Sequence, residues 1–232
     1  MPFSTGIALI FASTGLYAST FIVAKQGDAI IVGADSRVTL TIDYNRTRPG
    51  PDTCKIHKAA KGRYFVIASN PFINIKTGID FSELATRVFE TGGDLKAAAD
   101  AFEARALAAA ERILREDGQT TVLSVVLFGY DKGPFFYSRS IRRSATETYK
   151  QPEDCAGAAC SKWVTGGYHE VIDKLAPHAF STTPSESAIP FLIGKEIEAD
   201  KTGGIALPIA MFRLDGAGEH WLSPGACKPF AR

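Results

Sequence analysis

Strand-like and helix-like segments occur in separate blocks along this chain, and this order constrains the fold more than any other feature. Short β-rich runs fill residues 21–69, and two helical segments follow at 81–90 and 94–117. Strand signals return at 122–141, followed by two further helical segments and a last strand. Such blocks are typical of α+β proteins rather than parallel βαβ folds. Two antiparallel sheets packed together, with helix pairs outside, would bury all the apolar faces.

The helix boundaries follow from local signals. Apolar residues from Leu95 to Ile113 step by four and three, which predicts one helical stripe with Asp94 as its cap and Gly118 as its stop. Thr183-Pro184-Ser185-Glu186 is a capping box with proline at the first helical position, and it predicts a further helix. Pro190 is expected to kink that helix or to reset its start.

Two segments carry no clear strand or helix signal. Residues 43–53 contain Pro49, Gly50 and Pro51, so a loop is predicted there. Residues 148–161 are polar and then rich in alanine and glycine. We interpret them as a loop that covers the functional site or contacts a neighbouring subunit.

Charge and composition exclude several classes of protein. The 232 residues carry 26 Lys plus Arg against 25 Asp plus Glu, and a net charge of +1 gives little attraction for nucleic acid. No apolar run reaches the roughly 18–20 residues of a membrane span. The four histidines and four cysteines lack zinc-ligand spacing, so the sequence indicates no zinc site. No repeat or linker interrupts residues 19–232, which we expect to form one domain.

The first eighteen residues lack charged side chains and resemble a signal peptide or a pro-segment. Leu16 and Ala18 stand three and one residues before a possible cut ahead of Ser19. If this segment is a signal, the protein is exported to the periplasm or secreted; otherwise it is cytoplasmic. In an oxidising compartment Cys155 and Cys160 could close a small loop, whereas in a reducing one they are plain thiols.

Four short motifs stand out along the chain. They are Ser19-Thr20-Phe21-Ile22-Val23-Ala24-Lys25, Asp35-Ser36-Arg37, Cys54-Lys55-Ile56-His57 and Asp200-Lys201-Thr202-Gly203-Gly204. With the order of strands and helices, they make the chain resemble the proteasome-type threonine peptidases of the N-terminal-nucleophile hydrolases. The resemblance implies a four-layer α-β-β-α sandwich, a peptide or amide substrate, no cofactor, and a ring-type homo-oligomer.

The resemblance also implies roles for individual residues. Thr20 is the nucleophile and, once it is the first residue, its own α-amine is the base, because a free amine has a pKa of roughly 7.7–8.0. The Lys55 ammonium keeps the α-amine unprotonated by like-charge repulsion and favours the ionised form of the hydroxyl. Asp35 holds that ammonium in place. Asp200 and Thr202 orient the amine.

Further positions follow from the same likeness. Ser36 and Arg37 brace the turn after the second strand. Ser69 stands where the family has a glycine whose N–H points at the oxyanion, and Ile67 is expected to line the substrate pocket.

The register of the first strand leaves two candidates for the nucleophile. Counting back from Asp35 without a gap places Ser19 at the first position, whereas aligning the Phe21–Ala24 run with the family's first strand places Thr20 there. Thr20 is the favoured reading. Serine would follow the same chemistry, and a signal peptidase that cuts after Ala18 would expose it directly.

Three functions remain open from the sequence. The first is a proteasome-like peptidase or amidohydrolase that cleaves amide bonds with a terminal Thr20 or Ser19. The second is a non-catalytic structural subunit of the same fold, in which the Asp35-Ser36-Arg37 turn serves only packing. The third is a secreted amidase or acylase that acts on a small molecule.

Overall fold

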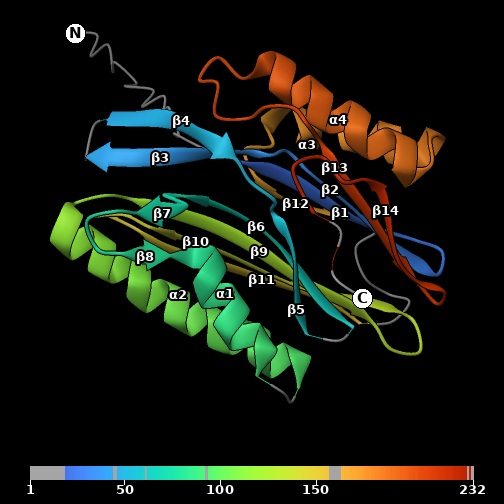
Figure 1. Cartoon of the computed structure of the whole chain (residues 1–232), viewed down its shortest axis with the longest axis horizontal. Coiled ribbons are helices and arrows are strands. Elements are labelled where there is room, and N and C mark those ends of the chain that lie inside the picture. Colours follow the sequence, from blue (N-terminus) through green and yellow to red (C-terminus); the bar gives the residue numbers. More distant parts are fainter. Residues whose placement is uncertain are drawn as a thin grey trace, which may run out of the picture.

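The computed structural model describes residues 19–43, 46–60, 62–91, 94–156, 163–228 and 230. The signal-like segment 1–18, Cys160 and the end of the 148–161 segment lie outside these residues. Within them, the chain forms two five-stranded antiparallel sheets, one small sheet and four helices (Figure 1).

Each large sheet is named after one of its strands. The β1 sheet has the order β12 (Trp163–Gly167), β1 (Thr20–Gln26), β2 (Ala29–Ala34), β13 (Ala210–Asp215), β14 (Gly218–Ser223). The β6 sheet has the order β11 (Thr148–Ala156), β10 (Pro134–Arg143), β9 (Thr121–Tyr130), β6 (Arg63–Asn70), β5 (Ile56–Ala60). The small sheet has the order β4 (Arg46–Asp52), β3 (Arg37–Asp43), β7 (Ile73–Asn74), β8 (Ile79–Asp80).

The helices cover the two outer faces of the sandwich. α1 (Phe81–Glu90) and α2 (Leu95–Asp117) lie along one face, and α3 (Glu170–Thr182) and α4 (Ser185–Ala199) lie along the other (Figure 1). Three apolar layers result: one under α1 and α2, one between the sheets, and one under α3 and α4. The expected α+β class with an α-β-β-α arrangement is confirmed.

Alternation along β1 shows how one strand serves two layers. Phe21 and Val23 belong to the core between the sheets, whereas Ile22 and Ala24 belong to the core under α3 and α4. Successive side chains on a strand point to opposite faces, so both sets of residues are apolar in a strand that is buried on both sides.

The capping signals are confirmed for α2 and wrong for α4. The Asp94 side chain accepts the Lys96 N–H at 2.8 Å, and Gly118 ends the helix in the left-handed conformation, with φ of 67°. The Thr183 capping box does not form. α4 begins at Ser185, whose N–H donates instead to the Gln26 side chain at 2.6 Å, and the helix continues through Pro190.

Two segments predicted as loops are strands. β4 contains Pro49 and Pro51, and β11 contains Pro152. Both strands lie at the edge of their sheet, where proline is tolerated because one row of N–H groups has no neighbouring strand. β11 runs to Ala156.

None of the described helices is both long and apolar enough to cross a membrane.

Candidate active site

Asp35 follows directly after β2, and its buried carboxylate collects four donors. Oδ1 accepts the Thr20 N–H at 2.7 Å and the Lys55 Nζ at 2.6 Å. Oδ2 accepts the Arg37 N–H at 3.0 Å and the Ala206 N–H at 3.4 Å. Because one oxygen binds both Lys55 and the Thr20 N–H, the ammonium lies beside the Ser19–Thr20 peptide group.

The ion pair between Asp35 and Lys55 is fully enclosed, with both side chains 0% exposed. Burial lowers the pKa of Lys55, and the Asp35 carboxylate opposes this shift. Burial likewise raises the pKa of Asp35, and the Lys55 ammonium opposes that. An ammonium and a carboxylate are seldom buried in a core for packing alone, since removing both from water costs free energy.

Ser19 and Thr20 point to opposite faces of the β1 sheet. Ser19 lines a small cavity of about 10 Å³ together with residues of β6 and β9, so its side chain faces the other sheet. Thr20 lies on the face of Ile22, towards α3 and α4, and lines neither cavity described here. Both hydroxyls are buried and make no hydrogen bond in the described part of the chain.

The small cavity also brings Ser69 to Ser19. Its remaining lining residues are Ala68, Asn70, Val122, Ser124 and Gly167. The Ile67 N–H donates to the Lys55 carbonyl at 3.2 Å, on the β5 side of β6. Backbone N–H groups on alternate residues share a side, so the Ser69 N–H points the same way, beyond the first β5 residue, Ile56. Ser69 itself lines the small cavity, so its N–H lies close to it.

Gly167 and Tyr168 fix the backbone of Ser19. Thr20 pairs with Gly167 in the β1–β12 ladder, and the Tyr168 N–H donates to the Ser19 carbonyl at 2.8 Å. Gly167 has φ of +81°, and a Cβ there would lie 1.9 Å from the Ser19 carbonyl oxygen. Only glycine allows this approach.

The other predicted site residues form a support around Asp35. Asp200 accepts the Thr202 N–H and hydroxyl at 2.8 and 2.6 Å, and the Ile205 N–H at 2.9 Å. These bonds hold a turn that leads to Ala206, and β13 begins only at Ala210. None of the hydrogen bonds described for Asp200 and Thr202 reaches Thr20 or Lys55.

The Asp35-Ser36-Arg37 turn is tied to its surroundings mainly through backbone groups. The Ser36 N–H donates to the Ala206 carbonyl at 3.3 Å, and the Ser36 carbonyl accepts the Thr53 N–H at 2.7 Å. The Arg37 guanidinium lies 3.6 Å from the Asp52 carboxylate, and both side chains are partly exposed. Ile67 lies fully buried in the core under α1 and α2 and lines neither cavity.

Sequence reasoning missed the disulfide that joins Cys54 to Cys227. It fixes the residue before Lys55 to the C-terminal segment, across 173 positions of sequence. Cys155 is also disulfide-bonded, and its predicted partner Cys160 lies outside the described residues. Sequence alone does not assign pairs among four cysteines, since three connectivities exist.

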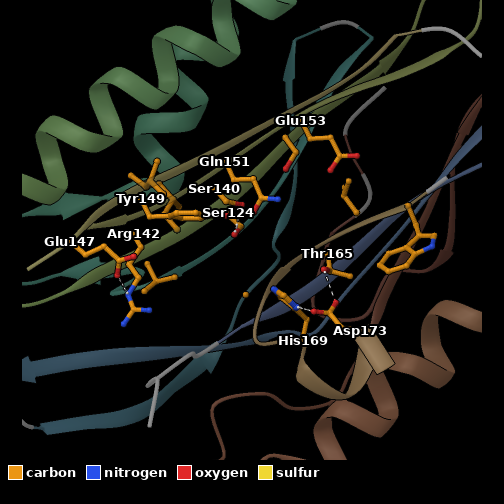
Figure 2. Close-up of a pocket in the computed structure, with 17 residues that line it drawn as sticks. Ser124, Ser140, Arg142, Glu147, Tyr149, Gln151, Glu153, Thr165, His169 and Asp173 are labelled. Carbon is orange, nitrogen blue, oxygen red and sulfur yellow. Dashed lines mark hydrogen bonds and ion pairs between the residues drawn. The ribbon is translucent and has the colours of Figure 1, made fainter. Parts of the chain in front are cut away.

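A second, larger cavity of about 530 Å³ opens beside the first and shares Val122, Ser124 and Gly167 with it. Ser124, Ser140, Gln151 and Glu153 lie on one wall, while Thr165, His169 and Asp173 lie across from them (Figure 2). This cavity was not predicted from the sequence. The signal that could have indicated it is the pair Ser138 and Ser140, two residues apart on β10, which gives one face of that strand a polar character.

No group of three or more His, Cys, Asp and Glu side chains suited to a metal ion occurs among the described residues. Ser19 contributes a buried hydroxyl to this site. The Lys55 ammonium and the Ser69 N–H supply positive charge and a hydrogen-bond donor nearby.

No family model and no curated protein matches the chain. Among solved structures, it is similar to Anbu (ancestral beta-subunit) from Yersinia bercovieri, with a TM-score of 0.58 and 12% sequence identity. The match covers 88% of this chain and 87% of that chain. A likeness at this identity shows the fold alone, and it supports the expected proteasome-like sandwich at that coarse level.

Proposed function

We propose that this protein is an N-terminal-nucleophile hydrolase that cleaves amide bonds of peptides or acyl amides through an ester on Ser19. The observation that carries the proposal is the buried Asp35–Lys55 pair, whose shared oxygen also binds the Thr20 N–H. This pair holds a positive charge against the peptide group of the nucleophile.

The proposed reaction uses only groups of the chain and water. After cleavage of the 18–19 bond, the Ser19 amine takes the hydroxyl proton while Oγ bonds to the substrate carbonyl carbon. The Ser69 N–H stabilises the negative charge on the carbonyl oxygen. The C–N bond then breaks, and the departing amine takes the proton from the α-ammonium. A water molecule then gives a proton to the Ser19 α-amine and attacks the ester carbon. The bond from that carbon to Oγ breaks, Oγ takes the proton back from the α-ammonium, and a carboxylic acid is released.

Two observations favour Ser19 over Thr20 as the nucleophile. The Ser19 side chain faces the cavity with Ser69, whereas that of Thr20 points towards α3 and α4. The ungapped count from Asp35 also gives Ser19. We therefore choose Ser19, the second of the two candidates from the sequence, because the nucleophile has to lie next to both the substrate carbonyl and the oxyanion donor.

The first experiment combines intact mass with activity. The full chain is expressed with and without a secretion apparatus, beside Ser19→Ala and Thr20→Val, and each is assayed on peptide and acyl-amide panels. We expect a mature chain that begins at Ser19, a loss of about 10³-fold or more in kcat/KM for Ser19→Ala, and near-normal activity for Thr20→Val. Thr20→Val keeps the shape of a side chain whose hydroxyl makes no hydrogen bond to any residue that the structure describes.

The same experiment separates the competing functions. A loss of activity in Thr20→Val, with Ser19→Ala active, would move the nucleophile to Thr20. A chain that stays intact from Met1 and is inert under every condition would favour the structural-subunit reading, in which the Asp35–Lys55 pair serves only the fold.

A further inference from the structure

The large cavity has a polar floor where the inner face of a sandwich is normally apolar. Ser124, Ser140 and Gln151 stand opposite one another on β9, β10 and β11, and the two serine hydroxyls are 2.9 Å apart. Further along the same face, Phe128 and Phe136 pack into the core between the sheets. The polar row begins at Ser124, which also lines the cavity of Ser19.

Within the described part of the chain, one carboxylate of this cavity has no partner of opposite charge. Arg142 lies 3.6 Å from Glu147, and His169 lies 2.8 Å from Asp173 (Figure 2). Glu153 makes no ion pair with any described residue, and its Oε1 is buried without a hydrogen bond. Such an oxygen costs free energy, which a cationic donor bound in the cavity would offset.

The sheet register gives the distance from the cleavage site to this carboxylate. Ser124 and Gln151 are two strand spacings apart, about 10 Å, and Glu153 stands two residues further along β11, opposite Ser138. An extended peptide advances about 3.3–3.6 Å per residue. A chain bound at Ser19 therefore reaches Glu153 with about its third residue. The volume of about 530 Å³ lies within the usual range for ligand pockets.

We propose that this cavity is the substrate subsite of the hydrolase and that it selects a cationic side chain about three residues from the cleaved bond. Glu153 receives the guanidinium or ammonium group, and Ser124, Ser140 and Gln151 bind the polar segment leading to it. The inference rests on the proposed function and identifies the substrate as a short basic peptide or a peptide-like amide.

The test uses the mature wild-type protein and a matched peptide series. Arginine is placed at each position on either side of one fixed cleavable bond, and citrulline, its uncharged analogue, replaces it in the paired series. We expect arginine to be preferred over citrulline in kcat/KM by about 10-fold or more at the third position on one side. Equal rates at every position overturn the proposal while leaving the hydrolase function intact.

Two variants assign the preference to one residue. Glu153→Gln is expected to abolish the difference in kcat/KM between arginine and citrulline. Glu90→Gln removes the same charge from an exposed position at the end of α1 and is expected to keep the preference. An arginine preference that survives in Glu153→Gln overturns the proposal.

A binding measurement keeps the two proposals separable. Titration calorimetry with arginine amide and citrulline amide measures binding to the cavity without hydrolysis. Tighter binding of arginine amide that disappears in Glu153→Gln supports the cationic subsite even if no substrate is cleaved. Equal binding of the two amides, or equal binding to both proteins, counts against it.

Discussion

Asp35 and Lys55 form a pair whose removal is expected to separate stability from activity. Lys55→Met leaves the Asp35 carboxylate buried without its cation, so we expect the free energy of unfolding to fall by about 3–5 kcal/mol. In the double variant Asp35→Asn/Lys55→Met, the buried charge is gone as well, and most of that loss is expected to return. Urea unfolding of the three proteins measures this.

Activity follows a different order in the same variants. Both variants lack the ammonium beside the Ser19–Thr20 peptide, so neither is expected to hydrolyse an amide substrate, and this includes the restabilised double variant. Lys55→Met with activity within about tenfold of the wild type would contradict the catalytic role. Recovery of activity in the double variant would do the same.

His57 makes stability depend on pH. Burial lowers the pKa of His57 to about 4, and the Asp80 carboxylate opposes this shift. Below pH 6.5 the unfolded chain therefore binds a proton that the folded chain accepts only near pH 4, so stability falls as pH drops through this window. The contribution is at most about 3 kcal/mol. Unfolding midpoints between pH 7 and pH 4 measure it.

The matched control for this prediction is an exposed histidine of α3. His57→Phe keeps the stacking on Phe65, whose ring centre lies 4.8 Å away, and removes the titrating group. It is expected to lose less stability on acidification than the wild type, whereas His178→Gln is expected to follow the wild type. Identical acid profiles for His57→Phe and the wild type would refute the assignment.

At the scale of elements, the β1–β12 ladder positions Ser19. Gly167→Ala forces a Cβ into the Ser19 carbonyl at a backbone conformation that alanine rarely adopts, so β12 or Ser19 has to shift. We expect activity to fall by about 100-fold or more, because displacements near 1 Å have that effect at active sites. Steady-state kinetics and thermal melting measure the change.

Gly194 provides the opposite case within α4. A Cβ there meets no heavy atom within 4 Å, and alanine is the better helix former. Gly194→Ala is expected to raise the free energy of unfolding by about 0.5–1 kcal/mol with unchanged activity. A loss of activity equal to that of Gly167→Ala would show that the effect at Gly167 is not local to Ser19.

The strands and helices were predictable where one periodicity dominates. The stripe from Leu95 to Ile113 has a clear helical period, and it formed as expected; β2, a short run rich in β-branched residues, also formed. β4 and β11 were not predictable from local residues, because their prolines are acceptable only at a sheet edge, and edge position is set by the whole fold.

The candidate site was predictable in composition but not in geometry. The sequence indicated Asp35, Lys55 and a hydroxyl residue at the start of the first strand, and the structure brings Asp35 and Lys55 together. A one-residue shift in register turns a side chain to the other face, so the choice between Ser19 and Thr20 required the β1 pairings. The Ala206 N–H that binds the Asp35 carboxylate could not be predicted, because it is a backbone group and any residue but proline would provide it.

At the scale of the whole molecule, the Cys54–Cys227 disulfide connects the site to the end of the chain. Cys54 precedes Lys55, and Cys227 lies in the core between the sheets, beside the packed rings of Trp221 and Phe230. Disulfides persist in oxidising compartments, which is where the protein would be if the segment 1–18 is a signal peptide.

This connection leads to a prediction about both stability and catalysis. Cys227→Ser frees a loop of 173 positions in the unfolded chain, so we expect the free energy of unfolding to fall by about 2–5 kcal/mol. Since Cys54 also loses its anchor beside Lys55, kcat is expected to fall while the chain remains folded. Denaturant unfolding and steady-state kinetics measure the two effects.

The double variant Cys54→Ser/Cys227→Ser tests whether the two cysteines act as one unit. Each single variant already breaks the bond, so the double variant is expected to lose no more than about 1 kcal/mol beyond either one. Adding a reductant to the double variant isolates the contribution of the Cys155 bond. Unchanged stability and kcat in Cys227→Ser would show that the C-terminal segment holds its place by packing alone and that Lys55 is positioned by Asp35 without help from the disulfide.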